Sequence, residues 1–317
     1  MKKLVFNAIL LLMVTSGCHA GNQSDVNNGI SASKIIKSID KGKPIVIEGM
    51  IIADDLDFTM VQGHTVFSTS YRIAEVNVPV TFLKCIFLGK VKTIGTIGNS
   101  AITTHFKSNL TFEGCDFRAE VDFSNATIDG MVNFTGAVFR GNAIFNNISI
   151  DGRNTYFTSF SSEKLFSMQE AFIGGSIDFF KGHSKGKISF QSTDIAGVAQ
   201  FSNLQCDGKA DFSLATFRSQ VLFTYSKFNS EFRMSGARCD GNCEIVSVVF
   251  GASAWICNSV FNGKVNFNNT EAVTLLDVSG SIFAKGKPDV EGLKLSANEN
   301  LVTNGTKFVA FSNFDNE

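Results

Sequence analysis

The feature that most constrains the fold is a spacing of large apolar residues that fits neither a helix nor an ordinary strand. Between residues 121 and 145 these residues are separated by 5, 6, 5 and 6 positions: Phe123, Ile128, Phe134, Phe139 and Phe145. The alternation extends backward to Phe106 and forward to Tyr156, and a second register runs without interruption from Met168 to Phe283. The step from Tyr156 to Met168 is 12 rather than 11, which predicts one inserted residue between the two tracts.

We call each of these regularly spaced apolar residues a centre. The residues around each centre alternate between apolar and polar, which indicates a short strand. The position two before a centre is small or apolar, as at Val121 and Ala210, and the position between is commonly polar, as at Asp122. Side chains of a strand point alternately to its two faces, so this pattern predicts an in–out–in strand. Gly, Asn and Ser follow, as turns require. Four sides of 5, 6, 5 and 6 residues make a coil of 22, and successive coils would stack at about 4.8 Å.

Three segments carry a resemblance to a known family. "VDFSN" (121–125), "VNFTG" (132–136) and "ADFSL" (210–214) resemble the unit of pentapeptide-repeat proteins, in a Phe-rich variant with 5 + 6 spacing. The resemblance covers residues 32–283 and implies an all-β fold, a right-handed quadrilateral β-helix. We therefore expect a solenoid of roughly nine or ten coils, about 45 Å long. Phe occurs 32 times against 1 Trp and 3 Tyr, in agreement with one interior position filled again and again.

The two ends of such a solenoid expose unpaired strand edges and an open core, so each end needs a cover. Residues 31–45 begin with a Ser, place Ile at helical spacing and end with Gly42 and Pro44, which predicts a short N-terminal helical cap. Residues 284–317 leave the register but still contain Phe308, Phe311 and Phe314. We interpret this last segment as an irregular C-terminal cap, with a homodimer formed through it as the alternative.

The N-terminus carries an export signal. Residues 1–17 have two Lys and then an apolar run that is too short to span a bilayer, as in a secretory signal peptide. "SGC", which ends at Cys18, resembles the lipobox of bacterial lipoproteins, in which the Cys becomes the lipidated N-terminus. Thr15 departs from that pattern, where the family usually has Leu. The alternative is ordinary cleavage near Ala20, which would release a soluble periplasmic or secreted protein.

The mature chain is expected to consist of a tether and one folded domain. Residues 18–30 are polar and rich in Gly and Asn, so they read as a flexible tether between a membrane anchor and the domain of residues 31–317. Within that domain, residues 59–75 and 88–105 interrupt the spacing and are expected to be insertions or irregular coils. These assignments place the protein in the bacterial cell envelope, lipid-anchored on the periplasmic or the surface side.

Composition argues against several classes of function. The net charge is −1, which is too weak a field for binding to nucleic acid or for mimicry of DNA. The six cysteines after Cys18 show no ligand spacing, and the four His are scattered, so we expect no metal and no cofactor. Small buried hydrophobes are a sufficient explanation of the cysteines. A disulfide between two of them stays open, because the compartment would be oxidising.

An enzyme is the main alternative, because right-handed β-helices also house polysaccharide-active enzymes. Such chemistry needs two carboxylates on one face. The outward positions related by 22 form two columns in the second tract: Asp178, Gln200, Leu222, Glu244 and Asn266, and Ser189, Asp211, Arg233 and Trp255. Neither column places two acids on successive coils. We therefore expect a non-catalytic scaffold, with a carbohydrate-active enzyme or glycan-binding protein as the alternative.

One outward feature stands out from the rest of the surface. Trp255 is the only Trp and is expected to point outward, with Arg233 one coil before it and Val249 and Val260 outward on the flanking sides. An exposed apolar group on the side of a solenoid can be a docking patch for an unknown protein or glycan partner. Single exposed apolar residues are also common on protein surfaces, so the patch is a hypothesis.

Overall fold

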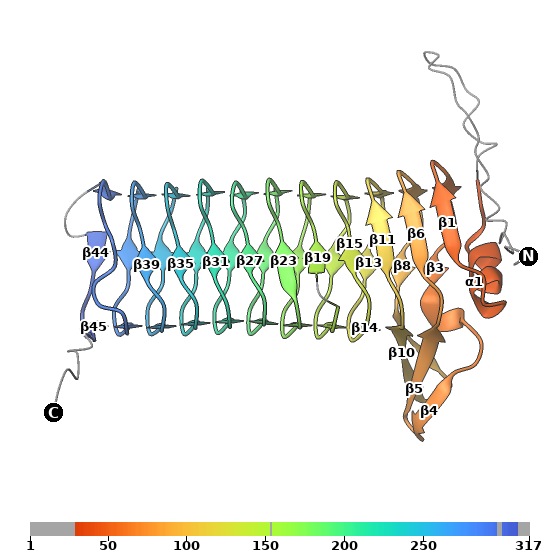
Figure 1. The fold of residues 1–317 in the computed structure, drawn as a ribbon. Coiled ribbons are helices and arrows are strands. Elements are labelled where there is room, and N and C mark those ends of the chain that lie inside the picture. The colour runs from red at the N-terminus through yellow and green to blue at the C-terminus, as the bar shows by residue number, and fades with distance from the viewer. Residues whose placement is uncertain (1–28, 153, 297–299, 310–317) are drawn as a thin grey trace, which may run out of the picture.

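The computed structural model describes residues 29–152, 154–296 and 300–309 of the chain (Figure 1). It is a nearly all-β solenoid whose strands run around four sides, which confirms the fold class expected from the spacing. Within these ranges, consecutive coils pair strand by strand in parallel and form four sheets along one rod. We name the sheets face 1 to face 4, in the order in which the chain passes through them.

Faces 1 to 3 contain one strand per coil, and face 4 contains two further strands, which belong to hairpins. Face 1 contains β1 (Ile45–Glu48), β6 (Val80–Leu83), β11 (Leu110–Glu113), β15 (Val132–Asn133), β19 (Asn154–Tyr156), β23 (Ser176–Asp178), β27 (Ala199–Gln200), β31 (Val221–Leu222), β35 (Cys243–Glu244) and β39 (Val265–Asn266). Face 2 contains β2 (Ile51–Ile52), β7 (Ile86–Phe87), β12 (Asp116–Phe117), β16 (Val138–Phe139), β20 (Ser161–Ser162), β24 (His183–Ser184), β28 (Gln205–Cys206), β32 (Lys227–Phe228), β36 (Val249–Phe250), β40 (Glu271–Ala272) and β43 (Lys294–Leu295).

The other two faces complete the coil. Face 3 contains β3 (Leu56–Asp57), β8 (Val91–Lys92), β13 (Val121–Asp122), β17 (Ala143–Ile144), β21 (Phe166–Ser167), β25 (Ile188–Ser189), β29 (Ala210–Asp211), β33 (Phe232–Arg233), β37 (Ala254–Trp255), β41 (Leu276–Asp277) and β44 (Leu301–Val302). Face 4 contains β4 (Thr65–Ser68), β5 (Tyr71–Val76), β9 (Ile94–Ile97), β10 (Ser100–Phe106), β14 (Thr127–Ile128), β18 (Ser149–Ile150), β22 (Phe172–Ile173), β26 (Asp194–Ile195), β30 (Thr216–Phe217), β34 (Arg238–Cys239), β38 (Val260–Phe261), β42 (Ile282–Phe283) and β45 (Lys307–Phe308).

The interior of the rod is built from stacked rings. Phe223 lies parallel to Phe201 of the coil before it, with ring centroids 5.2 Å apart, and both side chains are fully buried. Phe134 makes the same contact with Phe112 at 5.2 Å. Each coil therefore buries its rings against the neighbouring coils, which is the energetic basis of a solenoid. This arrangement agrees with the expected stacking of residues 22 apart.

The alternation of 5 and 6 has its origin in two kinds of corner. After faces 1 and 3 the chain turns in five residues, through a residue with positive φ two positions after the centre, such as Asn125 (φ 57°) and Asn203 (φ 56°). Asn tolerates this left-handed conformation better than most residues. After faces 2 and 4 the step has six residues and a close approach between coils. A Cβ added at Gly130 would lie 2.4 Å from the carbonyl carbon of Ser108, so glycine is required there.

The extra residue between the two tracts lies earlier than the spacing predicted. Thr155 pairs with Val132 and Tyr156 with Asn133, so Tyr156 is an outward residue and not a centre. Phe157 occupies the interior instead and stacks on Phe134 at 5.1 Å. The insertion therefore falls in the corner before β19, and the prediction for Tyr156 was wrong. Tyr156 and Phe157 are adjacent aromatic residues, so both were candidates for the interior position, and the regular spacing favoured Tyr156.

The N-terminal cap is a helix, as predicted. Helix α1 (Ala32–Asp40) buries Ala32, Ile35, Ile36 and Ile39 against the first coil. Its chain reverses at Gly42, which has a φ of 67°, and enters β1 after Pro44. Figure 1 shows α1 across the end of the rod, next to β1 and β3. No helix of the described residues is long and apolar enough to cross a membrane.

The segments expected to be insertions form a lobe beside the rod. Strands β4 and β5 make one antiparallel hairpin, β9 and β10 make a second, and β5 pairs in parallel with β10 from Ala101↔Tyr71 to Phe106↔Val76. A 3-10 turn, η2 (Phe58–Met60), leads into the first hairpin. We call residues 59–75 and 94–105 the lateral lobe, which projects from the side of the rod in Figure 1. The strand β8 between the hairpins keeps its regular place in face 3.

The segment expected to be an irregular C-terminal cap continues the ladder instead. Strands β43, β44 and β45 extend faces 2, 3 and 4 by one wider coil, and the ring of Phe308 stacks on Phe283 at 5.6 Å. The segment is thus irregular in spacing but regular in pairing. Phe308 is 42% exposed. Phe311 and Phe314 lie outside the described residues, as do residues 1–28 with the leader and Cys18.

Candidate interaction surfaces on face 3

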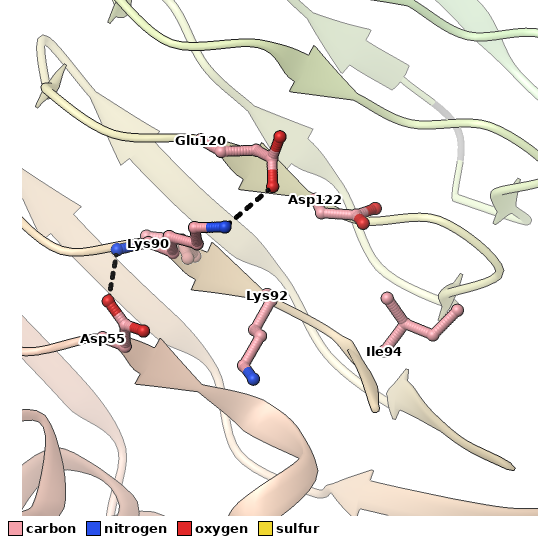
Figure 2. A pocket seen from close by; sticks show the side chains of 7 residues that line it. Asp55, Lys90, Lys92, Ile94, Glu120 and Asp122 are labelled. Atoms are coloured by element: carbon pink, nitrogen blue, oxygen red, sulfur yellow. Dashed lines mark hydrogen bonds and ion pairs between the residues drawn. The ribbon is translucent and has the colours of Figure 1, made fainter. Parts of the chain in front are cut away.

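A charged cleft lies on face 3 at the base of the lateral lobe. It has a volume of about 220 Å³ and is lined by Asp55, Lys90, Val91, Lys92, Ile94, Glu120 and Asp122. Figure 2 shows these side chains on three neighbouring coils, with Ile94 contributed by the second hairpin of the lobe. The floor of the cleft belongs to the rod, and one wall belongs to the lobe.

The charges of the cleft alternate from coil to coil. The pairing Leu56↔Val91↔Val121 brings three triplets of one pattern into register, each with two like charges around an aliphatic residue: Asp55–Leu56–Asp57, Lys90–Val91–Lys92 and Glu120–Val121–Asp122. The middle coil is therefore basic and lies between two acidic coils.

Ion pairs connect these rows. Lys90 Nζ lies 3.3 Å from Glu120 Oε1, and Lys92 Nζ lies 3.1 Å from Asp57 Oδ2. The backbone N–H of Lys90 also donates to Asp55 Oδ1 at 2.8 Å. Each ammonium is thus held against a carboxylate, and the cleft presents donors and acceptors at fixed places. Both kinds of group are available to a polar ligand, such as a peptide or a sugar.

The sole tryptophan lies on the same face, toward the other end of the rod. Trp255 is half-buried and points outward between buried Ala254 and Ile256, as predicted. The guanidinium of Arg233 lies over its ring, 4.9 Å from the centroid. Arg233 Nε in turn donates to Glu231 Oε1 at 2.8 Å. A cation over an indole is attracted by the negative face of the ring, so this pair is preorganised.

The flanking valines do not join this pair in one surface. Val249 lies on β36 of face 2, and Val260 lies on β38 of face 4, whereas Trp255 and Arg233 are neighbours on face 3. Faces 2 and 4 meet face 3 at opposite corners of the coil. The structure therefore brings together two of the four residues of the expected patch and leaves one valine on each adjoining side.

Residues 104–159 match the family model described as pentapeptide repeats (9 copies). This segment is therefore similar to a pentapeptide-repeat array. No curated protein and no solved structure gives a significant match to the chain. The repeat array and the four-sided solenoid are consistent with a non-catalytic scaffold, and the match points to no family of enzymes.

The outward columns of the repeat rod can be followed in the register of the strands. The strand register contains both columns expected from the spacing, one from Asp178 to Asn266 on face 1 and one from Ser189 to Trp255 on face 3. Ser189 and Asp211 of the second column are buried, however, and are not exposed as expected. In the cleft, Glu120 pairs with Lys90, whereas Asp55 accepts from the backbone N–H of Lys90 and Asp122 from that of Ser124. In the described part of the chain, no group of three or more His, Cys, Asp or Glu side chains could hold a metal ion.

Sequence reasoning missed the cleft, although a signal for it was present. The three triplets share one pattern, but the first two are separated by 35 positions rather than 22. The first hairpin of the lobe lies between them and accounts for most of this difference, and the second hairpin separates the second triplet from the third by 30 positions. A search at fixed period could therefore not align the three. A search for charged–aliphatic–charged triplets at any spacing would have found all three.

A second exposed feature is the tip of the lateral lobe. Phe67 is 75% exposed and its ring meets Tyr71 edge-on at 6.0 Å, while Val66 and Ile97 are also exposed. β4, which carries Phe67, ends its sheet and pairs only with β5. The lobe therefore adds an apolar tip and an open strand edge at the N-terminal end of the rod.

Proposed function

We propose that this protein is a non-catalytic binding scaffold of the bacterial envelope and that face 3 is the surface that contacts its partner. The observation that carries the proposal is the placement of two preorganised features on one sheet. The charged cleft occupies its first coils, and the Trp255–Arg233 pair occupies coils near its other end. A binding rod needs no reaction centre, only fixed groups along an accessible side.

The separation of the two features indicates the shape of the partner. Seven strand pairings lead from Lys92 on β8 to Trp255 on β37, which corresponds to about 34 Å at the ladder spacing. A small molecule cannot touch both places. An extended partner, either a protein segment or a glycan chain, can lie along face 3 and use the cleft and the indole together.

The indole and its guanidinium are the first test of this surface. Binding hot spots are enriched in Trp and Arg, and truncating such an anchor typically costs about 2 kcal/mol or more. Trp255→Ala should therefore weaken binding to the envelope partner by roughly thirtyfold and leave the melting temperature nearly unchanged. The partner is first recovered from envelope extracts with the wild-type protein, and its affinity is then measured by titration.

Val249→Ala and Val260→Ala are matched controls, because they remove apolar atoms of half-buried residues from faces 2 and 4 instead. Both should bind as the wild type does. Equal affinity of Trp255→Ala and wild type would place the binding surface elsewhere. A large fall in the melting temperature of Trp255→Ala would instead mean that the ring is a structural element of the rod.

A glycan is the second candidate partner, and the indole is the reason to consider it. A flat apolar ring beside a guanidinium offers a stacking surface and hydrogen-bond donors, which suit a sugar ring. Titration with oligosaccharides from the cell wall distinguishes this case from a protein partner. Product release from these oligosaccharides would instead favour the alternative of a carbohydrate-active enzyme.

The anchor belongs to the same proposal. Lipidation of Cys18 would hold the rod at a membrane through the tether of residues 18–30, with α1 nearest the anchor. The wild-type protein should then partition into detergent and incorporate labelled palmitate, and Cys18→Ser should abolish both. Recovery of a soluble wild-type protein that begins near Gly21 would show ordinary cleavage after Ala20 and no lipid anchor.

The open C-terminal end is the place where we propose that a second copy docks. An apolar hollow of about 240 Å³ lies there between the last coils, and Val290, Leu301 and Phe308 on its rim are exposed. A dimer would cover these rings. Phe308→Glu should convert it to a monomer in sedimentation experiments. A wild-type monomer that dimerises only after truncation behind Val309 would show that the chain's own last residues cover the end.

A further inference from the structure

Two buried cysteines lie side by side on neighbouring coils. Cys85 precedes β7 and Cys115 precedes β12, and the pairing of these strands sets Ile86 opposite Asp116. The two cysteines therefore occupy the same position of successive coils. They are 30 residues apart in sequence rather than 22 because the hairpin β9–β10 lies between them, so the repeat period does not reveal the pair.

The backbone positions of the two cysteines fit a disulfide. Both side chains are fully buried. Cys85 Sγ also lies 3.4 Å from the carbonyl oxygen of Ile47, and Cys115 Sγ lies 3.5 Å from that of Phe82. Stacked coils place Cα atoms about 4.8 Å apart, which is within the range of about 4.4–6.8 Å seen across disulfides.

We propose that Cys85 and Cys115 form a disulfide when the chain folds in contact with a disulfide oxidant, which the proposed envelope location would provide. One cysteine thiolate attacks a sulfur of the oxidant, which forms a mixed disulfide and releases the first thiol of the oxidant. The second cysteine thiolate then attacks the cysteine sulfur of the mixed disulfide and releases the second thiol of the oxidant. The cysteine pair loses two protons and two electrons, and the oxidant disulfide is reduced to two thiols. Both thiols are inaccessible in the finished rod, so the bond forms before these coils close.

The two thiols differ once the rod has formed. The interaction between them lowers the pKa of Cys85 below that of an ordinary thiol and raises the pKa of Cys115. Elsewhere in the rod burial dominates. It raises the pKa of Cys206 to about 12 and raises that of Cys239 as well.

The bond would tie the coil that carries the lateral lobe to the next coil. The closed loop runs from Cys85 to Cys115 and contains β8, the hairpin β9–β10 and the basic row of the cleft. Cross-linking a loop of this size restricts the unfolded chain and stabilises the folded one. The face 3 cleft would thus be braced at its base.

The experiment compares the full chain refolded from urea with glutathione disulfide present and with dithiothreitol present. Cys18→Ser is included in every variant, so that the leader cysteine does not react. We expect a cross-linked Cys85–Cys115 peptide in the map of the oxidised protein and a melting temperature higher by about 5–10 °C than in dithiothreitol. Recovery of both cysteines as alkylated thiols, or their linkage to other cysteines, would overturn the proposal.

Alanine variants separate the bond from ordinary packing. Ala137 occupies the same position one coil further on, so Cys85→Ala and Cys115→Ala should fold. Each should lose the melting difference between the two conditions, whereas Cys239→Ala should keep it. A difference that survives in Cys85→Ala contradicts the assignment. Protein extracted from cells is mapped as well. If both cysteines are free thiols in the cell but form the disulfide in vitro, the envelope location is refuted and the Cys85–Cys115 assignment stands.

Discussion

The regular rod of residues 121–283 and the N-terminal coils of residues 45–106 have the same cross-section, although they are built from very different lengths of chain. In the rod a coil takes 22 residues, with one additional residue before β19. In the N-terminal coils the corner between faces 3 and 4 is lengthened twice, yet β5 and β10 rejoin face 4 in register with β14. The repeat therefore specifies which side chains meet in the interior, and it places few limits on the length of chain inserted at a corner.

The two regions also differ in where their aromatic rings lie. Rings of the rod such as Phe223 are fully buried and stacked, whereas Phe67 in the lobe is exposed at the end of a sheet. The rod thus uses phenylalanine for stability, and the lobe displays it. Two predictions test this contrast and two more test the corners and the surface of the rod, in order of decreasing effect.

The largest effect is expected from shifting the register. Deleting residues 95–102 from the hairpin β9–β10 leaves the five-residue step of a regular corner between Thr93 and Phe106, so the variant should fold and melt within about 5 °C of wild type. Deleting residues 201–208 removes the same length from the rod and should prevent folding of the coils that follow, because it takes every later ring off its stack. Circular dichroism and gel filtration distinguish the two outcomes. Equal tolerance of both deletions would contradict the contrast.

The next effect concerns a single ring. Phe223→Ala should cost about 3–5 kcal/mol of unfolding free energy, because it leaves a cavity between two coils, and Phe223→Asp should prevent folding. Phe67→Ala should change stability by less than about 0.5 kcal/mol, since this ring is exposed. Urea denaturation measures all three. A soluble Phe223→Asp protein with a cooperative transition would show that the register is wrong.

A smaller effect is expected at the left-handed corners. Leu214 holds a φ of 60° and is 58% exposed, at a position where other coils have Asn, as at Asn258. Leu214→Asn should stabilise the rod by about 0.5–1 kcal/mol, because a branched apolar residue is strained in this conformation. Asn203→Leu should have the opposite effect in the same urea experiment. The explanation of the five-residue corner fails if both changes are neutral.

The smallest effect concerns a partly exposed polar cluster on face 2 and in the corner that follows it. Hydrogen bonds from Gln205, His183 and Asn229 lower the pKa of Asp207 to about 2. A depressed folded-state pKa contributes stability that is present above the unfolded value near 3.8 and is lost as pH falls toward 2. Asp207 is partly exposed, so solvent screening limits the contribution to less than about 1 kcal/mol. Wild type should lose this increment between pH 4 and 2 in urea titrations, and Asp207→Asn should not.

Most of the fold was predictable because one physical rule is repeated along the chain. Each coil must fill one interior, so the rings recur at fixed spacing, and the residue before each ring faces outward, as at Asp178 and Trp255. Helix α1 was predictable for a similar reason, since its Ile residues lie on one side. At Tyr156 the rule failed because two adjacent aromatic residues fitted it nearly equally well.

The candidate site was less predictable because it depends on chain that the rule does not cover. The lobe consists of short hairpins without a repeated pattern, and its length hides the register of Lys92 with Asp122 and of Cys85 with Cys115. The place of Val249 and Val260 shows a second reason. Residues five or six apart are close in sequence, but a corner turns each of them to a different side of the rod.

Because the rod is a stack of whole coils, the distance between the cleft and Trp255 is a whole number of coil spacings. Each additional coil lengthens the rod by about 4.8 Å and leaves the cross-section unchanged. A duplication of 22 residues would therefore move the indole away from the cleft by one step, with the same orientation, whereas a shorter insertion must loop out at a corner, as the lobe does. The spacing between outward side chains along the rod can therefore change only by whole coils of 22 residues.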